Sequence, residues 1–427
     1  MLGQRRTGVL CHLTSLPTPH LGREGAHRFI ETLHGMGVGV WQVLPIHPPD
    51  PHGSPYASPS AFAGWAALID PTSEPATEDE VNTFLANESD WVVDVARYTV
   101  LKHQHDGAPW TAWPAPLRDR EPNAMEQFDA DHAAAIHGVL KEQARFSRDW
   151  MQMRTVAAAH NLQMFGDIPF FVAHDSADVW AAPERFLLGA SGNPTVVSGV
   201  PPDYFSEDGQ RWGTPLYAWD VHLAEDFAWW RRRMQRMFDL FDLVRIDHFR
   251  AVDSAWAIPA DHSTARDGVW TPGPGDALLQ AIRAPEGKHL VAEDLGIIPQ
   301  SVLDLRDRHG LPGMAVLHFA DGQPKNPHRP EHHTVNTVVY TGTHDNDTTV
   351  GWGQRPLQDV LRDALTSPAC LAVIPLQDVM GLGSEARMNT PGTVDGNWGW
   401  RFAWDDLNRP SVARFRAAVA SHRPSGA

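Results

Sequence analysis

Acidic residues follow short apolar runs at four places in the sequence. These segments are Gly166-Asp167-Ile168-Pro169, Arg245-Ile246-Asp247-His248, Ala292-Glu293-Asp294-Leu295 and Gly342-Thr343-His344-Asp345. A carboxylate at the end of a buried strand is costly unless it is paired or used. If the strands share one rim, their acids form a pocket with Arg245, His248 and His344. Such a pocket suits glycoside cleavage, in which one carboxyl protonates the leaving oxygen and another attacks the sugar or activates water.

Two of these acids have different surroundings in the sequence. Residues at i and i+2 share one face of a strand, so Arg245 and Asp247 point the same way. A guanidinium beside a carboxylate favours the ionised form, which suits a nucleophile. Glu293 follows an apolar run, and burial raises the pKa of a carboxyl, which suits a general acid. Taken alone, the Arg245–Asp247 pair is more often a structural ion pair of the core, and the other acids favour a catalytic interpretation.

Eight β-like runs are available to position these residues. They span residues 8–13, 39–45, 164–172, 242–249, 289–295, 313–319, 337–344 and 371–377. Helical patterns, such as residues 131–160, lie between several of the runs, which predicts parallel β/α units. Eight such units close a (β/α)₈ barrel. Periodicity alone leaves an open doubly wound sheet as the alternative.

The connections between the runs are uneven in length. We expect a single catalytic barrel over residues 1–427 with two insertions on its C-terminal rim. One insertion, residues 46–163, lies between the second and third strands and is expected to form a helical subdomain. The other, residues 173–241, lies between the third and fourth strands and is expected to carry an active-site loop. Connections this long inside a compact domain are usually functional.

Composition limits the possible partners and the compartment. The formal net charge is -17, which argues against a nucleic-acid partner. No uninterrupted apolar stretch approaches the roughly 18 residues that a membrane span needs. The two cysteines, Cys11 and Cys370, suit a reducing cytoplasm, and the first residues make a poor secretory signal. We therefore expect a soluble cytoplasmic protein, and we find no sequence signal for its oligomeric state.

The motifs, taken in order, resemble those of the amylomaltases, which are 4-α-glucanotransferases (disproportionating enzymes) of the α-amylase clan. The matching segments are residues 8–17, 41–45, 54–64, 166–180, 199–217, 244–250, 292–296, 313–317, 340–352 and 374–401. The resemblance implies a (β/α)₈ barrel that transfers α-1,4-glucan segments between maltooligosaccharides or chains derived from starch or glycogen. It implies retention through a covalent glucosyl-enzyme intermediate, and it calls for no cofactor and no metal.

The resemblance also implies roles for the acids and their neighbours. Asp247 is similar to the family's nucleophile, and Glu293 is similar to its general acid/base. Asp345 is similar to the third acid, which holds the hydroxyls at positions 2 and 3 of the sugar in subsite −1. Arg245 and His344 match the usual companions of the nucleophile and of the third acid.

Other positions match the family's substrate-binding residues. Those expected to contact glucan are Asp167, Tyr56, His248, Tyr204, Phe205 and Trp212. Asp167 and Tyr56 fall where the family contacts the glucose in subsite −1. Tyr204, Phe205 and Trp212 lie in a stretch similar to the family's loop over the cleft. Asn397 and Trp398 match a C-terminal motif for which we expect a structural role at least as readily as a functional one.

Two departures and two rival functions accompany the resemblance. The chain looks shorter than the family pattern before Trp91 and between Trp352 and Ala369, which affects the outer acceptor subsites. A hydrolase of the same clan would use the same acids with water as the acceptor. An inactive glucan-binding protein is the other alternative, but binding alone does not need three carboxylates facing one sugar.

Overall fold

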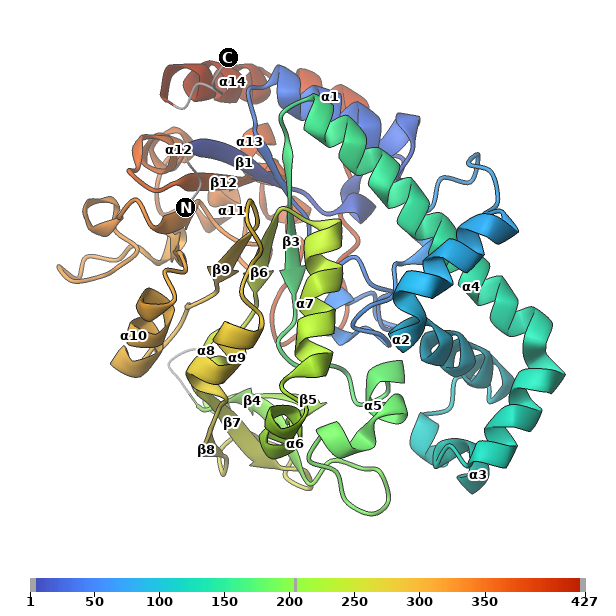
Figure 1. Ribbon diagram of the computed structural model, residues 1–427. Coiled ribbons are helices and arrows are strands. Elements are labelled where there is room, and N and C mark those ends of the chain that lie inside the picture. Colours follow the sequence, from blue (N-terminus) through green and yellow to red (C-terminus); the bar gives the residue numbers. More distant parts are fainter. Residues whose placement is uncertain (1–4, 203–205, 423–427) are drawn as a thin grey trace.

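The computed structural model describes residues 5–202 and 206–422 and is organised around one sheet of eight parallel strands (Figure 1). The strands are β1 (Arg6–Leu10), β2 (Val40–Gln42), β3 (Gln163–Ile168), β6 (Leu243–Ile246), β9 (His289–Ala292), β10 (Gly313–Val316), β11 (Thr337–Tyr340) and β12 (Leu371–Pro375). Each strand overlaps one of the eight predicted runs. The prediction of a parallel β/α barrel is therefore confirmed, and the open doubly wound sheet is excluded.

The barrel is nearly closed, with one weak seam. The spatial order of the strands is β10-β11-β12-β1-β2-β3-β6-β9, so β9 and β10 lie at the two ends of the sheet. Within the described residues these two strands share no ladder. A backbone hydrogen bond of 2.9 Å from the Ala292 N–H to the Pro312 carbonyl links them instead. Strand β9, which leads to Glu293, is therefore an edge strand beside the seam.

Strand periodicity directs the acids into the barrel. Alternate residues such as Phe165, Leu243 and Val291 belong to the apolar cluster inside the barrel. Their neighbours in sequence, including Val244 and Ile246, belong to the cluster between strands and helices. Because side chains at i and i+2 share a face, Asp167, Arg245 with Asp247, and Glu293 continue the inward rows beyond the apolar layer. The same alternation that builds the core thus delivers the polar residues to one mouth.

Helices cover the outside of the barrel, as in other β/α barrels. The α-helices of the described residues are α1 (Arg28–Gly35), α2 (Glu78–Gln104), α3 (Ala115–Arg118), α4 (Pro122–Ala159), α5 (Ala177–Ala181), α6 (Trp219–Ala224), α7 (Ala228–Leu240), α8 (Arg250–Asp253), α9 (Gly275–Ala281), α10 (Gln300–Arg308), α11 (Thr349–Trp352), α12 (Leu357–Thr366), α13 (Leu376–Met380) and α14 (Pro410–His422). Among the described residues, no helix is both long and apolar enough to cross a membrane.

Helices α2, α3 and α4 fill the connection between β2 and β3. Helix α4 runs down the right side of the molecule and packs against α2 (Figure 1). Thr77 and Glu80 begin α2 with a capping box, in which each side chain binds the other residue's backbone N–H. Non-helical backbone at His132 kinks α4 within its 38 residues. The predicted helix at residues 131–160 is the second part of α4.

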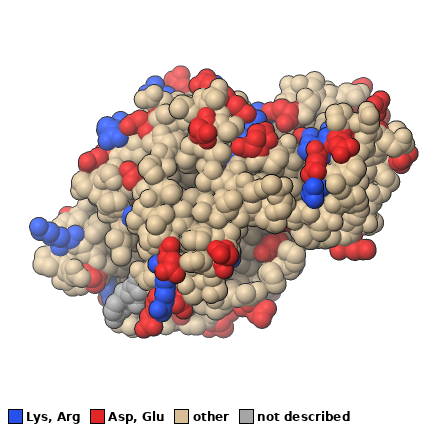
Figure 2. Space-filling view, turned by 90° about the horizontal axis from the view of Figure 1, so that it is seen from below, with Lys and Arg blue, Asp and Glu red and all other residues tan. Residues whose placement is uncertain are grey.

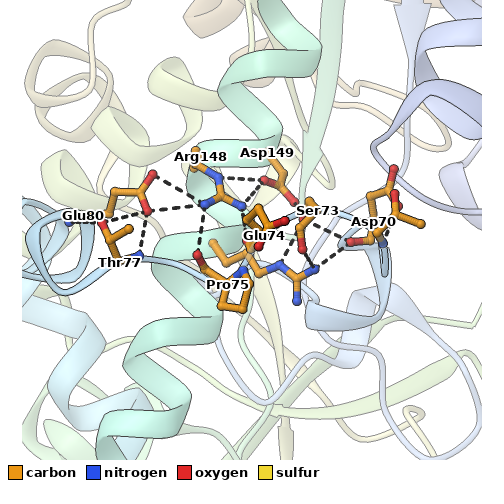
Figure 3. A network of polar contacts seen from close by, with 10 residues as sticks. Asp70, Ser73, Glu74, Pro75, Thr77, Glu80, Arg148 and Asp149 are labelled. Atoms are coloured by element: carbon orange, nitrogen blue, oxygen red, sulfur yellow. Dashed lines mark hydrogen bonds and ion pairs between the residues drawn. The ribbon is translucent and has the colours of Figure 1, made fainter.

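A polar network fastens α4 to the connection that precedes α2 (Figure 3). The Arg148 guanidinium donates to the Glu74 carbonyl at 2.6 Å and forms an ion pair with Glu80 at 3.3 Å. Asp149 accepts a hydrogen bond of 2.6 Å from the Ser73 hydroxyl. These contacts fix the path of the chain between the barrel and the helical insertion.

A second, antiparallel sheet was not predicted. It consists of β4 (Val196–Val200), β5 (Gln210–Pro215), β7 (Ser254–Pro259) and β8 (Val269–Pro272), in the order β5-β4-β7-β8, and lies at the lower end of Figure 1. For residues 173–241, which contain β4 and β5, we expected an active-site loop, because glycine and proline disfavour strands. Gly199 is instead required by the pairing, since a Cβ there would lie 2.1 Å from the Gln210 carbonyl oxygen.

Candidate active site

A buried guanidinium joins two acids from neighbouring strands. Arg245 Nη1 lies 2.6 Å from Asp167 Oδ2, and Arg245 Nη2 lies 2.8 Å from Asp247 Oδ1. Asp167 and Arg245 are register partners on β3 and β6, which explains why they meet. The Asp167 side chain is fully buried, whereas that of Asp247 is 28 % exposed. Asp247 is thus the acid of this pair that a ligand can reach, and the predicted shared face of Arg245 and Asp247 is confirmed.

Tyr56 shows that acids from separate strands converge. Its hydroxyl donates to Asp167 Oδ2 at 2.6 Å, from a short turn capped by Ser54. Burial raises the pKa of the Tyr56 phenol well above its usual value. The charges of Asp167, Asp247 and Asp345 act in the same direction. Asp167 contacts the phenol directly and shares Arg245 with Asp247. The His344 ring, next to Asp345 in the sequence, stacks on Tyr56.

Glu293 is buried immediately after β9 and accepts two backbone hydrogen bonds. Oε2 accepts from the His248 N–H at 2.7 Å, and Oε1 accepts from the Leu295 N–H at 2.9 Å. Burial, reinforced by the charge of Asp247, raises the pKa of Glu293 to about 7, although Arg245 and the two N–H groups oppose the rise. The expectation that burial raises the pKa of this carboxyl is confirmed. Glu293 can therefore both give and take a proton near neutral pH.

The acid next to Glu293 has a different environment. Asp294 accepts a hydrogen bond of 2.8 Å from the Met314 N–H and forms an ion pair with Arg306 at 2.5 Å. These partners lie on and beside β10, across the seam from β9. Asp294 therefore helps to hold the seam and does not share the pocket contacts of Glu293.

His248 turns the chain between the two acids. Its φ is 51°, in the left-handed region that residues other than glycine rarely adopt. This turn aims its N–H at Glu293 while its ring meets the Trp212 indole edge-on, with centroids 4.7 Å apart. Burial lowers the pKa of His248 to about 4, so the imidazole is neutral at pH 7. Strain of this kind is characteristic of functional sites.

Asp345 and His344 follow β11 and complete the mouth. The His344 ring stacks on Tyr56, with centroids 5.3 Å apart and planes 13° apart. Asp345 Oδ1 accepts a hydrogen bond of 2.6 Å from the Asn389 amide, and its side chain is 42 % exposed. Asp347 is instead a structural acid, because it accepts hydrogen bonds from the Thr348 N–H and the Ser384 hydroxyl.

Near the acids, one residue, Asn389, was not predicted, and the role of another, Trp398, was left open. The Trp398 ring lies 5.8 Å from Tyr56 and 6.0 Å from His344, so it belongs to the wall of the site. Asn397 accepts a hydrogen bond from the Thr390 N–H and shapes the turn that carries Trp398. Asn389 gave no signal, because its contact with Asp345 spans 44 residues of sequence.

Of the predicted binding residues in the loop, Trp212 lies on β5 and is 40 % exposed beside His248. Tyr204 and Phe205 lie outside the described residues. Figure 2 views the molecule from the end that carries the second sheet, and shows a hollow bordered by acidic side chains.

A cavity of about 520 Å³ lies at the opposite end of the barrel strands. Its lining includes Leu243, His289 and Val338, which stand at or near the starts of β6, β9 and β11. None of the acids described above lines it. In β/α barrels, chemistry occurs at the C-terminal ends of the strands, so we assign the site to the mouth with the acids.

Comparison with known proteins agrees with this geometry. A family model described as 4-alpha-glucanotransferase (glycoside hydrolase family 77) matches residues 11–78, 71–358 and 354–407. The 4-alpha-glucanotransferase of Thermus thermophilus is 42 % identical over 496 positions, covering 98 % of this chain and 99 % of the relative. The chloroplastic/amyloplastic 4-alpha-glucanotransferase of Arabidopsis thaliana is 40 % identical, covering 96 % of this chain and 84 % of the relative.

Solved structures give the same result. The structure of amylomaltase from Streptococcus agalactiae in complex with acarbose has a TM-score of 0.92 and 30 % identity, covering 99 % of this chain and 100 % of that chain. Amylomaltase from Corynebacterium glutamicum shares the fold, with a TM-score of 0.81 at 16 % identity, covering 98 % of this chain and 75 % of that chain. The matched family model and these relatives show that the chain belongs to the 4-alpha-glucanotransferase family, glycoside hydrolase family 77.

Proposed function

We propose that the chain, as a 4-α-glucanotransferase, transfers α-1,4-glucan segments between maltooligosaccharides or starch chains by retaining double displacement at this mouth. The observation that carries the proposal is the contrast between two acids. Asp247 is ion-paired with Arg245 and partly exposed, whereas Glu293 is buried with its pKa raised to about 7. Two carboxyls whose environments differ in this way divide the roles of nucleophile and general acid.

In the first half-reaction, Asp247 attacks the anomeric carbon and forms a covalent glucosyl ester. Protonated Glu293 gives its proton to the glycosidic oxygen, so the leaving chain departs as an alcohol. Retention predicts that the carboxyl groups of Asp247 and Glu293 are about 5–5.5 Å apart. Both acids follow adjacent parallel strands, β6 and β9, which supports this spacing.

In the second half-reaction, Glu293 is a carboxylate and acts as the base. It takes the proton from the 4-hydroxyl of an acceptor glucan, and the oxygen attacks the anomeric carbon and displaces Asp247. A pKa near 7 suits both directions of transfer, because the group must be an acid in one step and a base in the next.

The other pocket residues are proposed to hold the sugar in subsite −1. Asp345, fixed by the Asn389 amide, is placed to accept hydrogen bonds from the hydroxyls at positions 2 and 3. Asp167, Tyr56 and His344 are joined by a hydrogen bond and ring stacking, so they form a preorganised wall.

On the acceptor side, exposed Trp212 beside His248 is proposed to offer an apolar surface to the incoming chain. The expected contributions of Tyr204 and Phe205 remain part of the proposal.

The domain organisation is also proposed. Residues 1–427 form one catalytic barrel unit, with rim insertions at 46–163 and 173–241 that border the cleft. Helices α2 to α4 and strands β4 and β5, which lie in these ranges, support the proposal. We further propose a cytoplasmic location, supported by the scarcity of cysteine, of which the sequence has two.

Maltotriose tests the proposal directly. A transferase converts it to glucose and a ladder of longer oligosaccharides, with the number of reducing ends constant. A hydrolase instead gives shorter products and a steady rise in reducing ends. That second outcome would overturn transfer. Binding without any product would support the inactive binding protein.

A further inference from the structure

Consecutive residues after β6 hold the segment that carries Glu293. The His248 N–H donates to Glu293 Oε2 at 2.7 Å, and the Phe249 N–H donates to the Glu293 carbonyl at 3.0 Å. The Arg250 guanidinium then donates to the Ile297 carbonyl. The two ends of the acid's segment are thus tied to the segment that begins with the nucleophile. This matters because β9 is the edge strand at the seam.

A tryptophan from the second sheet covers Arg250. The guanidinium carbon lies 3.7 Å from the centroid of the Trp270 ring, which is a close cation–π contact. Trp270 lies against Trp256, with centroids 5.1 Å apart, and the Trp256 indole N–H donates to the Ala265 carbonyl at 2.9 Å. Among the described residues, Arg250 Nε is buried without a hydrogen-bond partner. Stacking on Trp270 therefore helps to orient the guanidinium toward Ile297.

We infer that Arg250 and Trp270 are positioning residues that hold Glu293 at the distance from Asp247 at which it can exchange a proton with the glycosidic oxygen. This inference rests on the proposed function of Glu293. Neither residue needs to touch the glucan. The unpredicted second sheet thereby has a role in catalysis, because β8 supplies the ring that orients Arg250.

The size of the expected effect follows from the geometry of proton transfer. General acid–base catalysis contributes about 10²–10⁴ in rate, and a misplacement of about 1 Å can cost about 10². Loosening the contact with Ile297 lets the acid's segment move while the two hydrogen bonds to the backbone of residues 248 and 249 remain. We therefore expect a partial loss of turnover and not its abolition.

Trp270 is also 39 % exposed, so a direct contact with glucan is the rival explanation. Aromatic rings are common platforms for sugars, and loss of such a platform weakens binding of ground state and transition state alike. The rival predicts a raised KM with unchanged kcat. Positioning predicts a lowered kcat with little change in KM.

The experiment compares Trp270→Leu and Arg250→Gln with the conservative variants Trp270→Phe and Arg250→Lys. Steady-state kinetics on maltotriose are measured well below the lowest Tm of the set. We expect Trp270→Leu and Arg250→Gln to lower kcat about 10- to 100-fold with KM within about twofold. Trp270→Phe keeps a ring over the guanidinium and should restore most of the activity. Arg250→Lys keeps the charge and should be intermediate.

A matched control comes from another cation–π pair. Arg28 lies over the Trp404 ring at 4.2 Å, on elements outside the site. Trp404→Leu removes an equivalent stacking contact and should leave kcat unchanged. A similar fall in kcat in Trp404→Leu would mean that loss of stacking acts through general destabilisation, and would overturn the inference.

Other outcomes are equally decisive. A raised KM with normal kcat in Trp270→Leu, or normal kinetics in Arg250→Gln, would overturn the positioning role. If Trp270→Leu does not fold, the comparison of Arg250→Gln with Arg250→Lys still tests it. Glu293→Gln distinguishes a failure of the proposed function from a failure of the positioning role alone. If that variant is active, the proposed function fails, whereas an inactive Glu293→Gln beside normal Trp270→Leu rejects this inference alone.

Discussion

The barrel mouth and the α2–α4 insertion both pair arginines with acids, but to different effect. In the mouth, Arg245 bridges Asp167 and Asp247 where its own side chain is 5 % exposed. In the insertion, the Arg148 side chain is 20 % exposed and pairs both with Glu80, which is 38 % exposed, and with the buried Asp149. Burial raises the pKa of Glu293 in the mouth, whereas a backbone hydrogen bond from Thr77 lowers the pKa of Glu80. The same side-chain chemistry therefore yields reactive groups where the acids line an open mouth, and structural contacts where they join one segment to another.

Burial also explains why the two regions differ in what they can do. Exposed ion pairs contribute about 0–1 kcal/mol, because water and salt screen them. Buried charges interact strongly with each other and with a ligand, and they are costly when a partner is lost. The mouth thus places strongly interacting charges where a ligand can meet them. The insertion is a region where polar contacts only secure the chain.

The largest difference should follow from removing one proton donor. Glu293→Gln keeps the shape of the side chain but cannot donate or accept the catalytic proton, so we expect kcat on maltotriose to fall by about 10²–10⁴. Glu80→Gln in the insertion is the matched control and should leave kcat unchanged. Near-normal turnover in Glu293→Gln would show that the mouth and the insertion do not differ in their effect on kcat.

The next largest effect should follow from removing the buried guanidinium. Arg245→Ala leaves the carboxylate of Asp167 buried without its cation, and we expect a loss of about 3–5 kcal/mol in the free energy of unfolding. Urea unfolding followed by circular dichroism measures this value. A loss no greater than that of an exposed pair would show that Asp167 takes up a proton and so avoids the cost.

The two regions should respond to pH with opposite sign. Glu293 has its folded-state pKa raised from 4.5 to about 7, so the folded chain holds a proton that the unfolded chain releases. As the pH rises from the lower to the higher of these two values, the contribution of Glu293 to the free energy of unfolding decreases. Glu293→Gln should therefore gain in Tm relative to the wild type over that interval. Activity as kcat/KM should decline above about pH 7, as Glu293 loses its proton.

For Glu80 the pKa is lowered in the folded state, so its contribution is present above the unfolded pKa and is lost as the pH falls. The Tm deficit of Glu80→Gln should shrink on acidification. If the Tm differences of Glu293→Gln and Glu80→Gln from the wild type changed with pH in the same direction, the two regions would not differ as expected.

The smallest effect is expected at Lys141 on α4. Lys141→Ala removes its ion pair with Glu78, in which both side chains are at least 40 % exposed. We expect only a small fall in Tm, with kcat unchanged and with the fall smaller at high salt. A fall in kcat would indicate that the insertion influences the mouth through α4.

Much of this arrangement could be predicted because parallel barrel strands are continuous apolar runs. The residues at i+2 beyond the inner row, such as Asp167 and Glu293, then face the same mouth. The second sheet could not be predicted, because its strands contain glycine where backbones approach closely, as at Gly199. Asn389 and Trp398 were not predicted as site residues because only the tertiary fold brings them near Asp345 and Tyr56.

The seam between β9 and β10, where the described residues form no ladder, has a mechanical consequence. A barrel bonded along all but one of its strand pairs resists deformation everywhere except at the gap between β9 and β10. Amide hydrogens that border this gap should exchange for deuterium sooner than those in the ladders around β1, since opening there breaks few bonds. The most easily deformed part of the barrel wall therefore lies beside Glu293, the group that must serve two successive chemical steps.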